Sequence, residues 1–215
     1  MSKDETSRFA TVNGLKLRVR TSYSLGSTPS KPVLVLFHGY SFSLDEWEKI
    51  GTLAELSLHE IPYVALDLPK GKSTKSQKRE ESNLSDYVPL LRDVFRNVGV
   101  DPSSKLIIVG PSMGGGFALQ YAIENKNQVV GLALIAPSLS GVDIASLETL
   151  DIPTLLIWGD KDSVFPVEEQ GRELKALLPR SKLLIIKGAR HPAYLDRPQE
   201  FHDLLLDFVD EISFT

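Results

Sequence analysis

Short apolar runs alternate with amphipathic segments along most of the chain, and this alternation predicts its architecture. Continuous apolar runs, typical of strands buried on both faces, cover residues 32–37, 63–66, 105–109, 129–135, 154–158 and 183–186. Apolar side chains at helical spacing mark the segments between them, at residues 44–60, 84–98, 114–124, 166–178 and 199–209. Strands that alternate with helices in this way predict an α/β fold with a doubly wound, mostly parallel sheet.

The first residues predict a different element, an antiparallel hairpin. Residues 9–12 and 15–19 have the character of two short strands, and Asn13-Gly14 between them is the strongest short-range signal for a two-residue turn. We expect this hairpin at one edge of the sheet, which then has about eight strands. With 215 residues in total, the chain has the length of one domain, spanning residues 1–215.

Composition and charge exclude several function classes. A net charge of −4 gives no reason to expect a nucleic-acid partner, and the absence of cysteine excludes disulfides, a thiolate nucleophile and cysteine-ligated metal. The first residues lack the apolar core of a signal peptide and no apolar run approaches 18 residues, so we expect a cytoplasmic protein without a membrane segment. Residues 70–83 are polar and of mixed charge, which we interpret as a solvated loop rather than a binding patch.

The strongest candidate for chemistry is the pentapeptide Gly110-Pro111-Ser112-Met113-Gly114. It follows an apolar strand and precedes a segment that predicts a helix, so the serine stands at the apex of a sharp strand-to-helix turn. Such a turn needs small residues on both sides of the serine and exposes its hydroxyl. The N–H of Met113 can then help to bind an oxyanion. A glycine-rich turn without chemistry is the alternative interpretation of this motif alone.

The ends of two later strands supply the acid and the base that a serine nucleophile requires. Asp160 and Asp162 follow the strand at 154–158, and His191 follows the strand at 183–186. Because ligands bind at the carboxyl ends of parallel strands, these groups are expected to lie at one edge of the sheet with Ser112. We predict a catalytic triad of Ser112, His191 as base and Asp162 as the acid that orients it. Asp160 competes for the acid role and is otherwise a carboxylate that stabilises the loop.

The other histidines are weaker candidates for a base. His59 and His202 fall on predicted helices, and His38 precedes a glycine at a strand end, where packing or a local hydrogen bond is the expected role. The loop after that strand should supply the second oxyanion donor. We assign this donor to the N–H of Tyr40, with the N–H of Ser41 as the alternative.

These motifs together resemble those of the α/β-hydrolase fold superfamily, over roughly residues 9–211. The likeness is closest to the small lidless group around α/β-hydrolase domain-containing protein 14. It is carried by the segments 38–47, 67–73, 111–112, 159–162 and 187–198, which read His-Gly-x-x-Phe-Ser-x-x-x-Trp, Asp-Leu-Pro-x-Gly-x-Ser, Pro-Ser, Gly-Asp-x-Asp and Lys-Gly-Ala-x-His-Pro-x-Tyr-Leu-Asp-x-Pro. The resemblance implies that Ser112 is the nucleophile, His191 the base and Asp162 the acid. Fold alone does not define a substrate.

The segment between the strands at 129–135 and 154–158 bears on substrate size. Residues 137–153 can form a loop and a short helix around 143–150, but they are too few for a lid domain. We therefore expect a fairly open site that fits short acyl chains. Its predicted lining consists of Tyr40, Phe42, Met113, Leu139, Val142, Phe165 and Tyr194.

The sequence thus predicts a serine-dependent carboxylic-ester hydrolase that acts on small esters through an acyl-enzyme. We expect it to need neither a metal ion nor a cofactor. The same triad could serve an acyltransferase, a thioesterase or an amidase, and the same pocket could serve a non-catalytic module that binds a small ligand or a protein. The oligomeric state is left open.

Overall fold

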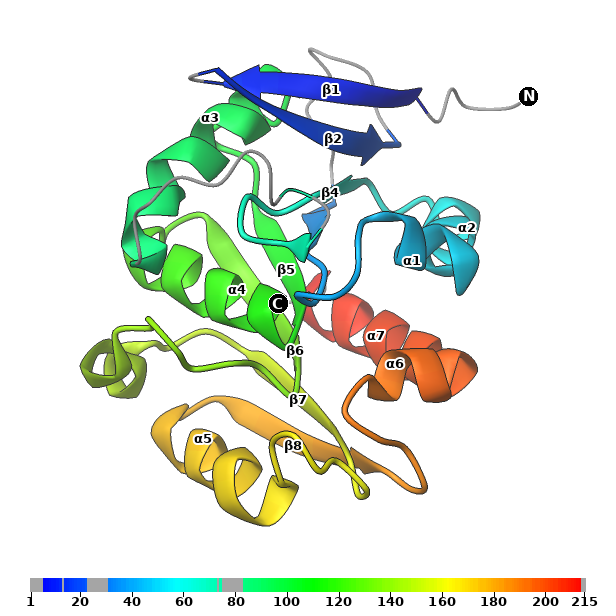
Figure 1. Ribbon diagram of the computed structural model, residues 1–215, viewed down its shortest axis with the longest axis vertical. Helices are drawn as coiled ribbons and strands as arrows, with labels where there is room; N and C mark the ends of the chain where they lie inside the picture. The colour runs from blue at the N-terminus through cyan, green and yellow to red at the C-terminus, as the bar shows by residue number, and fades with distance from the viewer. Residues whose placement is uncertain (1–5, 13, 23–30, 73, 75–82, 214–215) are drawn as a thin grey trace.

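The strands of the protein form a single sheet whose order differs from their order in the sequence. The computed structural model describes residues 6–12, 14–22, 31–72, 74 and 83–213. In this part of the chain, eight strands lie in the order β1-β2-β4-β3-β5-β6-β7-β8 (Figure 1). They are β1 (Thr6–Val12), β2 (Leu15–Thr21), β3 (Val33–Leu36), β4 (Tyr63–Leu66), β5 (Leu106–Pro111), β6 (Val129–Ile135), β7 (Thr154–Gly159) and β8 (Ser181–Ile186).

Strand directions confirm the predicted fold class. β1 pairs with β2 and β2 with β4 in antiparallel fashion, whereas every neighbouring pair from β4 to β8 is parallel. The first hairpin therefore forms the antiparallel edge of a mostly parallel sheet. Its register pairs Val12 with Leu15, and Asn13 of the predicted turn lies outside the described residues.

Helices cover both faces of this sheet. In Figure 1, α3, α4 and α5 lie on one side and α1, α2, α6 and α7 on the other. The helical elements are α1 (Asp45–Lys49), α2 (Thr52–Leu58), η2 (Leu84–Tyr87), α3 (Val88–Asn97), α4 (Met113–Glu124), η3 (Ile144–Thr149), η4 (Val167–Gly171), α5 (Arg172–Leu177), α6 (Ala193–Asp196) and α7 (Pro198–Ser213).

Each face of the sheet has its own hydrophobic core. β3 shows why, because its successive side chains point to opposite faces. Val33 and Val35 join the core under α3 and α4, whereas Leu34 and Leu36 join the core under α1 and α7. All of them are fully buried, which explains the continuous apolar run in the sequence.

Three of the predicted helices differ from the observed ones. The segment at 44–60 is two helices, because Gly51 between α1 and α2 has a φ of +84°, a conformation that glycine adopts without a steric cost. The segment at 84–98 begins with the 3₁₀ turn η2, and the segment at 166–178 begins with the π-helical turn η4. The apolar spacing continues across these breaks because both parts of each segment pack on the same core.

The last strand begins earlier than its apolar run predicts, at Ser181. Among the described strands, β8 has a neighbour on one side only, and its Leu184 and Ile185 are exposed. An edge strand of this kind mixes buried and exposed positions, so no apolar run marks the residue at which β8 begins. The polar loop predicted at 70–83 lies mostly outside the described residues. Within the described part of the chain, none of the helices has the length and apolar character needed to cross a bilayer.

Candidate active site

Ser112 lies at the sharp turn between β5 and α4, in a backbone conformation that non-glycine residues rarely adopt. Its φ is +49° and its ψ is −118°. Two glycines permit this turn, because other backbone atoms lie too close to them to leave room for a side chain. A Cβ atom at Gly110 would lie 2.5 Å from the carbonyl oxygen of Gly114, and one at Gly114 would lie 2.7 Å from that of His38. Strain of this kind persists where the surrounding structure holds it, and it is frequent at functional sites.

Asp162 and His191 are brought together from the ends of β7 and β8. The Asp162 Oδ2 atom lies 2.8 Å from Nδ1 of His191, and the Asp162 side chain is fully buried. Its other oxygen accepts hydrogen bonds from the N–H groups of Val164 and Phe165, at 2.8 and 2.9 Å. A carboxylate only accepts hydrogen bonds, so Asp162 holds the imidazole proton on Nδ1 and leaves Nε2 with a free lone pair.

Asp160, the competing acid, has a different partner. Its Oδ1 atom accepts a hydrogen bond from the Gly188 N–H at 2.6 Å and so joins the turn after β7 to the turn after β8. On the other side of His191, the Arg190 N–H and guanidinium both donate to the Asp196 carboxylate, at 2.8 and 2.6 Å. The structure therefore places Asp162 on the histidine ring and gives Asp160 a contact with the loop that carries it.

The residues predicted to line the pocket differ in exposure. Phe42, Leu139 and Phe165 are half-buried, and the ring of Phe165 makes an edge contact with the His191 ring at 5.1 Å between centroids. Val142 is buried. Tyr194 is 1% exposed and packs on Trp47 and Phe201 in the core under α1 and α7, with no surface available to a ligand.

The segment between β6 and β7 is tied to the body of the protein. It contains the short helix η3 and no inserted domain, and all of its residues are described. The Gln170 amide donates to Pro137 O at 2.5 Å, and Gln120 accepts a hydrogen bond from the Asp143 N–H at 3.1 Å. Ser138 N–H donates to Ser112 O at 2.8 Å. The segment thus packs beside the strained turn and is not a separate lid.

The loop after β3 lies next to Ser112. A Cβ atom at Gly39 would lie 3.8 Å from the Cβ of Ser112 and 3.3 Å from the ring of Phe42. The following residue, Tyr40, is 43% exposed, and its N–H donates to no group among the described residues. Met113 is the first residue of α4, where N–H groups lack an intrahelical acceptor. Met113 therefore adjoins Ser112 in the chain, and Tyr40 directly follows Gly39, which lies beside Ser112.

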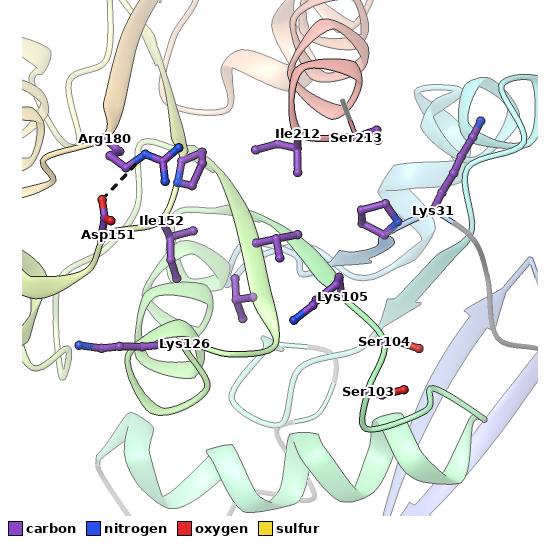
Figure 2. Close-up of a pocket in the computed structure, with 14 residues that line it drawn as sticks. Lys31, Ser103, Ser104, Lys105, Lys126, Asp151, Ile152, Arg180, Ile212 and Ser213 are labelled. Carbon is purple, nitrogen blue, oxygen red and sulfur yellow. Dashed lines mark ion pairs between the residues drawn. The ribbon is translucent and has the colours of Figure 1, made fainter. Parts of the chain in front are cut away.

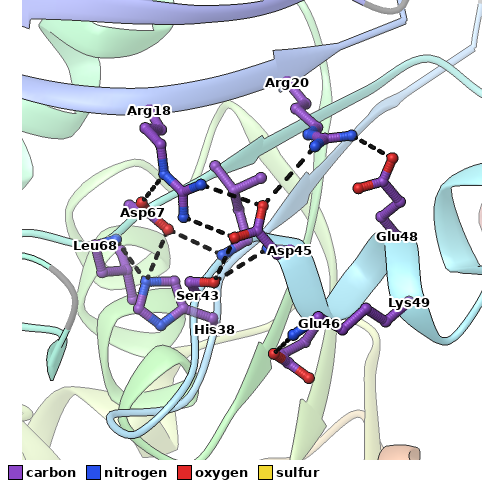
Figure 3. Close-up of polar contacts among 11 residues, drawn as sticks. Arg18, Arg20, His38, Ser43, Asp45, Glu46, Glu48, Lys49, Asp67 and Leu68 are labelled. Carbon is purple, nitrogen blue, oxygen red and sulfur yellow. Dashed lines mark hydrogen bonds and ion pairs between the residues drawn. The ribbon is translucent and has the colours of Figure 1, made fainter.

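A network of polar and charged side chains contacts this loop (Figure 3). The Asp67 carboxylate accepts hydrogen bonds from the Leu44 N–H at 2.9 Å and from Nε of Arg18 at 2.7 Å. Arg18 also donates to Asp45 at 3.0 Å, so β2 is joined to the start of α1 and to the end of β4. Neither Arg18 nor Asp45 is among the residues predicted from the sequence. Arg18 and Arg20 lie two residues apart on one strand and therefore share a face, which is the signal that could have identified them.

The ring of His38 is part of the same network and is fully buried. Burial lowers the pKa of His38 below its usual value. The hydrogen bond to Gly39 and the charge of Asp67 act in the opposite direction, whereas the charge of Arg18 lowers the pKa further. Because the backbone N–H of Leu68 donates to Nε2 at 2.8 Å, the folded protein favours the neutral ring.

We expect the free energy of unfolding to fall as the pH drops below about 6.5, the usual histidine pKa. Burial also lowers the pKa of His202, although Glu55 and Asp203 oppose this effect. Below a pH of about 6.5, these histidines bind protons in the unfolded chain but remain neutral in the folded protein. Each histidine can therefore contribute up to about 1.4 kcal/mol per pH unit to the slope of the unfolding free energy, until the pH reaches its folded pKa. Urea unfolding between about pH 7.5 and 5.5 measures this slope. It should be smaller in His202→Gln, and an unchanged slope in that variant would contradict the assignment.

A separate cavity of about 520 Å³ opens at the amino ends of the parallel strands, opposite the end that carries Ser112. Residues before or at the start of β5, β6, β7 and β8 line it (Figure 2). Its cations have partners within the protein. Lys105 donates to Asn127 O at 2.8 Å and Lys126 to Thr149 Oγ1 at 3.1 Å. None of the predicted catalytic residues lines it. Over the described part of the chain, no cluster of three or more His, Asp or Glu side chains is arranged to hold a metal ion.

Comparison with protein families gives two matches that together extend over most of the chain. The family described as "Serine aminopeptidase, S33" matches residues 28–146. The family described as "alpha/beta hydrolase fold" matches residues 143–198. The first match includes the Ser112 turn and the loop after β3, and the second includes Asp162 and His191.

Individual proteins are similar over most of the chain. "Putative protein-lysine deacylase ABHD14B" of Rattus norvegicus is 31% identical over 186 residues, which cover 84% of this chain and 84% of that protein. "Protein ABHD14A" of Danio rerio is 32% identical over 181 residues, or 84% of this chain and 65% of that protein. Among solved structures, a predicted CIB-like hydrolase from Thermoplasma acidophilum superposes with a TM-score of 0.82 at 26% identity, covering 95% of this chain and 97% of that one.

Proposed function

This chain belongs to the α/β-hydrolase fold family of hydrolases, and we propose that it cleaves short-acyl carboxylic esters through an acyl-enzyme on Ser112. The observation that carries the proposal is the hydrogen bond between Asp162 and Nδ1 of His191, which leaves Nε2 able to accept a proton. The strained turn at Ser112 supports it, because a strand-to-helix turn of this kind presents its serine hydroxyl for reaction, and Met113 at the start of α4 follows directly.

The proposed reaction has two halves. Ser112 Oγ attacks the ester carbonyl while His191 Nε2 accepts the hydroxyl proton. The N–H groups of Tyr40 and Met113 donate to the oxyanion of the tetrahedral intermediate. His191 then returns the proton to the leaving alkoxide, and an alcohol departs. In the second half, water attacks the acyl-enzyme with the same proton transfers and releases the carboxylic acid.

The segment between β6 and β7 supports a preference for short acyl chains. It packs against the body of the protein through Gln120 and Gln170, so little surface is left to enclose a long chain. Each buried methylene contributes about 0.8 kcal/mol to binding, and the gain ends where the chain leaves the pocket. Binding energy that grows only over the first few carbons predicts a maximum in kcat/KM at short chains.

Hydrolysis of p-nitrophenyl esters with acyl chains of increasing length tests the proposal. We expect kcat/KM to be highest at about two to six carbons and to fall for longer chains, because only a few methylenes can be buried. No jump in rate should occur at the critical micelle concentration of the substrate. A preference for chains of about twelve carbons or more would contradict the proposed substrate class. A wild-type protein that binds esters without turnover would instead indicate a binding module.

A second candidate is hydrolysis of an acyl group bound to a lysine side chain, which is an amide. The observation that favours it is the name of the Rattus norvegicus relative, a "Putative protein-lysine deacylase". The same residues would act, but His191 must then protonate a poorer leaving group, an amine. Comparing an acetyl-lysine peptide with its acetate-ester analogue under one set of conditions distinguishes the two. A higher kcat/KM for the peptide would favour the amide as the substrate.

A further inference from the structure

The peptide between Gly39 and Tyr40 carries the N–H group to which we assign the second oxyanion contact. A trans peptide is planar, so its C=O and N–H groups point in opposite directions, and fixing one fixes the other. Gly39 O accepts two hydrogen bonds, from the Phe42 N–H at 3.1 Å and from Nδ1 of His38 at 2.8 Å. A rotation that redirects the Tyr40 N–H would have to break both of them.

The His38 ring is itself held in one orientation and one tautomer. The Leu68 N–H can only donate, so Nε2 is the acceptor and the ring proton is on Nδ1. Gly39 O can only accept, which is consistent with this assignment. A Cβ atom at Gly71 would lie 2.6 Å from Cε1 of the ring, so the turn at Gly71 packs closely against its edge. The ring therefore bridges the loop after β3 and the loop after β4.

A second contact between the same two loops fixes the next peptide. The Lys72 N–H donates to Tyr40 O at 2.8 Å. Because this carbonyl belongs to the peptide that carries the Ser41 N–H, the alternative oxyanion donor is oriented too. The Asp67 carboxylate adds a third contact through the Leu44 N–H and is held from the other side by Arg18 of the first hairpin (Figure 3).

We infer that His38 is a positioning residue that sets the direction of the Tyr40 N–H, and that the loop at 67–72 holds the oxyanion loop in place with it. The inference rests on the proposed function, since it concerns the same oxyanion site. In this role His38 makes no contact with substrate. Its effect passes entirely through the carbonyl of Gly39.

A matched pair of substitutions separates the two hydrogen bonds of the His38 ring. In His38→Asn, the side-chain amide nitrogen can lie near the position of Nδ1 and still donate to Gly39 O. In His38→Gln, the side-chain oxygen can lie near the position of Nε2 and accept from Leu68, but the side-chain donor to Gly39 O is lost and only the Phe42 N–H still donates to that oxygen. Each variant loses one buried hydrogen bond. A purely structural role of His38 therefore predicts similar effects of the two substitutions on kcat.

We expect kcat for ester hydrolysis to fall by roughly 10- to 100-fold in His38→Gln and by less than about 5-fold in His38→Asn, with KM little changed in both. The loss of kcat in His38→Gln should not exceed the cost of removing a whole oxyanion donor, which is about 10²- to 10³-fold. Equal losses in the two variants would overturn the inference. So would an equal effect on KM and kcat.

A readout that needs no turnover keeps the inference separate from the proposed function. The ¹H–¹⁵N signal of the Tyr40 amide should shift in His38→Gln and stay near its wild-type position in His38→Asn. If the wild type hydrolyses no ester and no acyl-lysine peptide, the proposed function fails, and the Tyr40 signal alone decides whether His38 orients this peptide. An unshifted signal in His38→Gln would reject that role.

If His38→Gln does not fold, a second pair at Lys72 provides the test. Lys72→Pro removes the N–H that holds Tyr40 O, whereas Lys72→Ala keeps it and removes only an exposed side chain. Lys72 lies in a 3₁₀ turn, whose φ is close to that of proline. We expect the proline variant alone to lower kcat and to shift the Ser41 amide signal. Equal behaviour of the two variants would contradict the role of this loop.

Discussion

Replacement of Ser112 by alanine is expected to lower kcat/KM for ester hydrolysis by about 10³-fold or more, because the members of a triad act as a unit. The expected loss comes from the missing Oγ atom, since the alanine variant can retain the Ser112 N–H bond to Ile135 O and the Ser138 N–H bond to the residue 112 carbonyl. The melting temperature should therefore change little. Steady-state kinetics and a thermal melt of the same preparation measure both quantities.

A serine-directed phosphonate provides the control for this substitution. It should label the wild type at Ser112 and leave Ser112→Ala unlabelled, as peptide mapping can establish. Retention of more than about a tenth of the wild-type activity would exclude Ser112 as the nucleophile, because that loss is far below the cost of removing a triad member. Label on another serine would identify a different nucleophile.

The elements that the sequence predicts well are those whose burial is uniform. β5 and β6 are enclosed by strands on both sides and by helices on both faces, so their sequences are continuous apolar runs. β8 lies at the edge and mixes buried with exposed positions, and its first residues carry no such signal. The break at Gly51 was missed because α1 and α2 bury side chains in the same core, and that common core preserves one apolar spacing across two helices.

The candidate site likewise has residues that the sequence predicts and contacts that it does not predict. Ser112, Asp162 and His191 are predicted from the sequence because each follows a recognisable strand, and parallel strands place their carboxyl ends at one end of the sheet. The contacts that support the loop after β3 depend on pairing between distant segments. Arg18 reaches Asp67 because β2 lies antiparallel beside β4, a relation that local sequence patterns do not encode. Tyr194, which was expected to line the pocket, lies in the core because α6 packs it against α1.

Substitution of the two aspartates after β7 tests which carboxylate holds His191 in the tautomer that a base requires. Asp162 Oδ1 accepts from two backbone N–H groups, and Oδ2 contacts His191. In Asp162→Asn, the amide oxygen must keep facing those N–H groups, so the amide NH₂ faces Nδ1 of His191. Nδ1 must then accept, and the ring proton moves to Nε2, where it prevents uptake of the Ser112 proton. We expect a loss of about 10⁴-fold in kcat, the cost of the wrong tautomer in serine proteases.

Asp160→Asn is the matched control, two residues away in the same turn. An asparagine oxygen can still accept from the Gly188 N–H, so only the charge of this exposed residue is lost. We expect less than about a 10-fold change in kcat, since the histidine keeps its tautomer. The ¹⁵N signals of His191 should show the proton on Nδ1 in the wild type and in Asp160→Asn, and on Nε2 in Asp162→Asn. A larger loss of kcat in Asp160→Asn, with the Nδ1 tautomer preserved in Asp162→Asn, would transfer the acid role to Asp160. Equal losses with unchanged tautomers would mean that both carboxylates act only by holding the loops after β7 and β8.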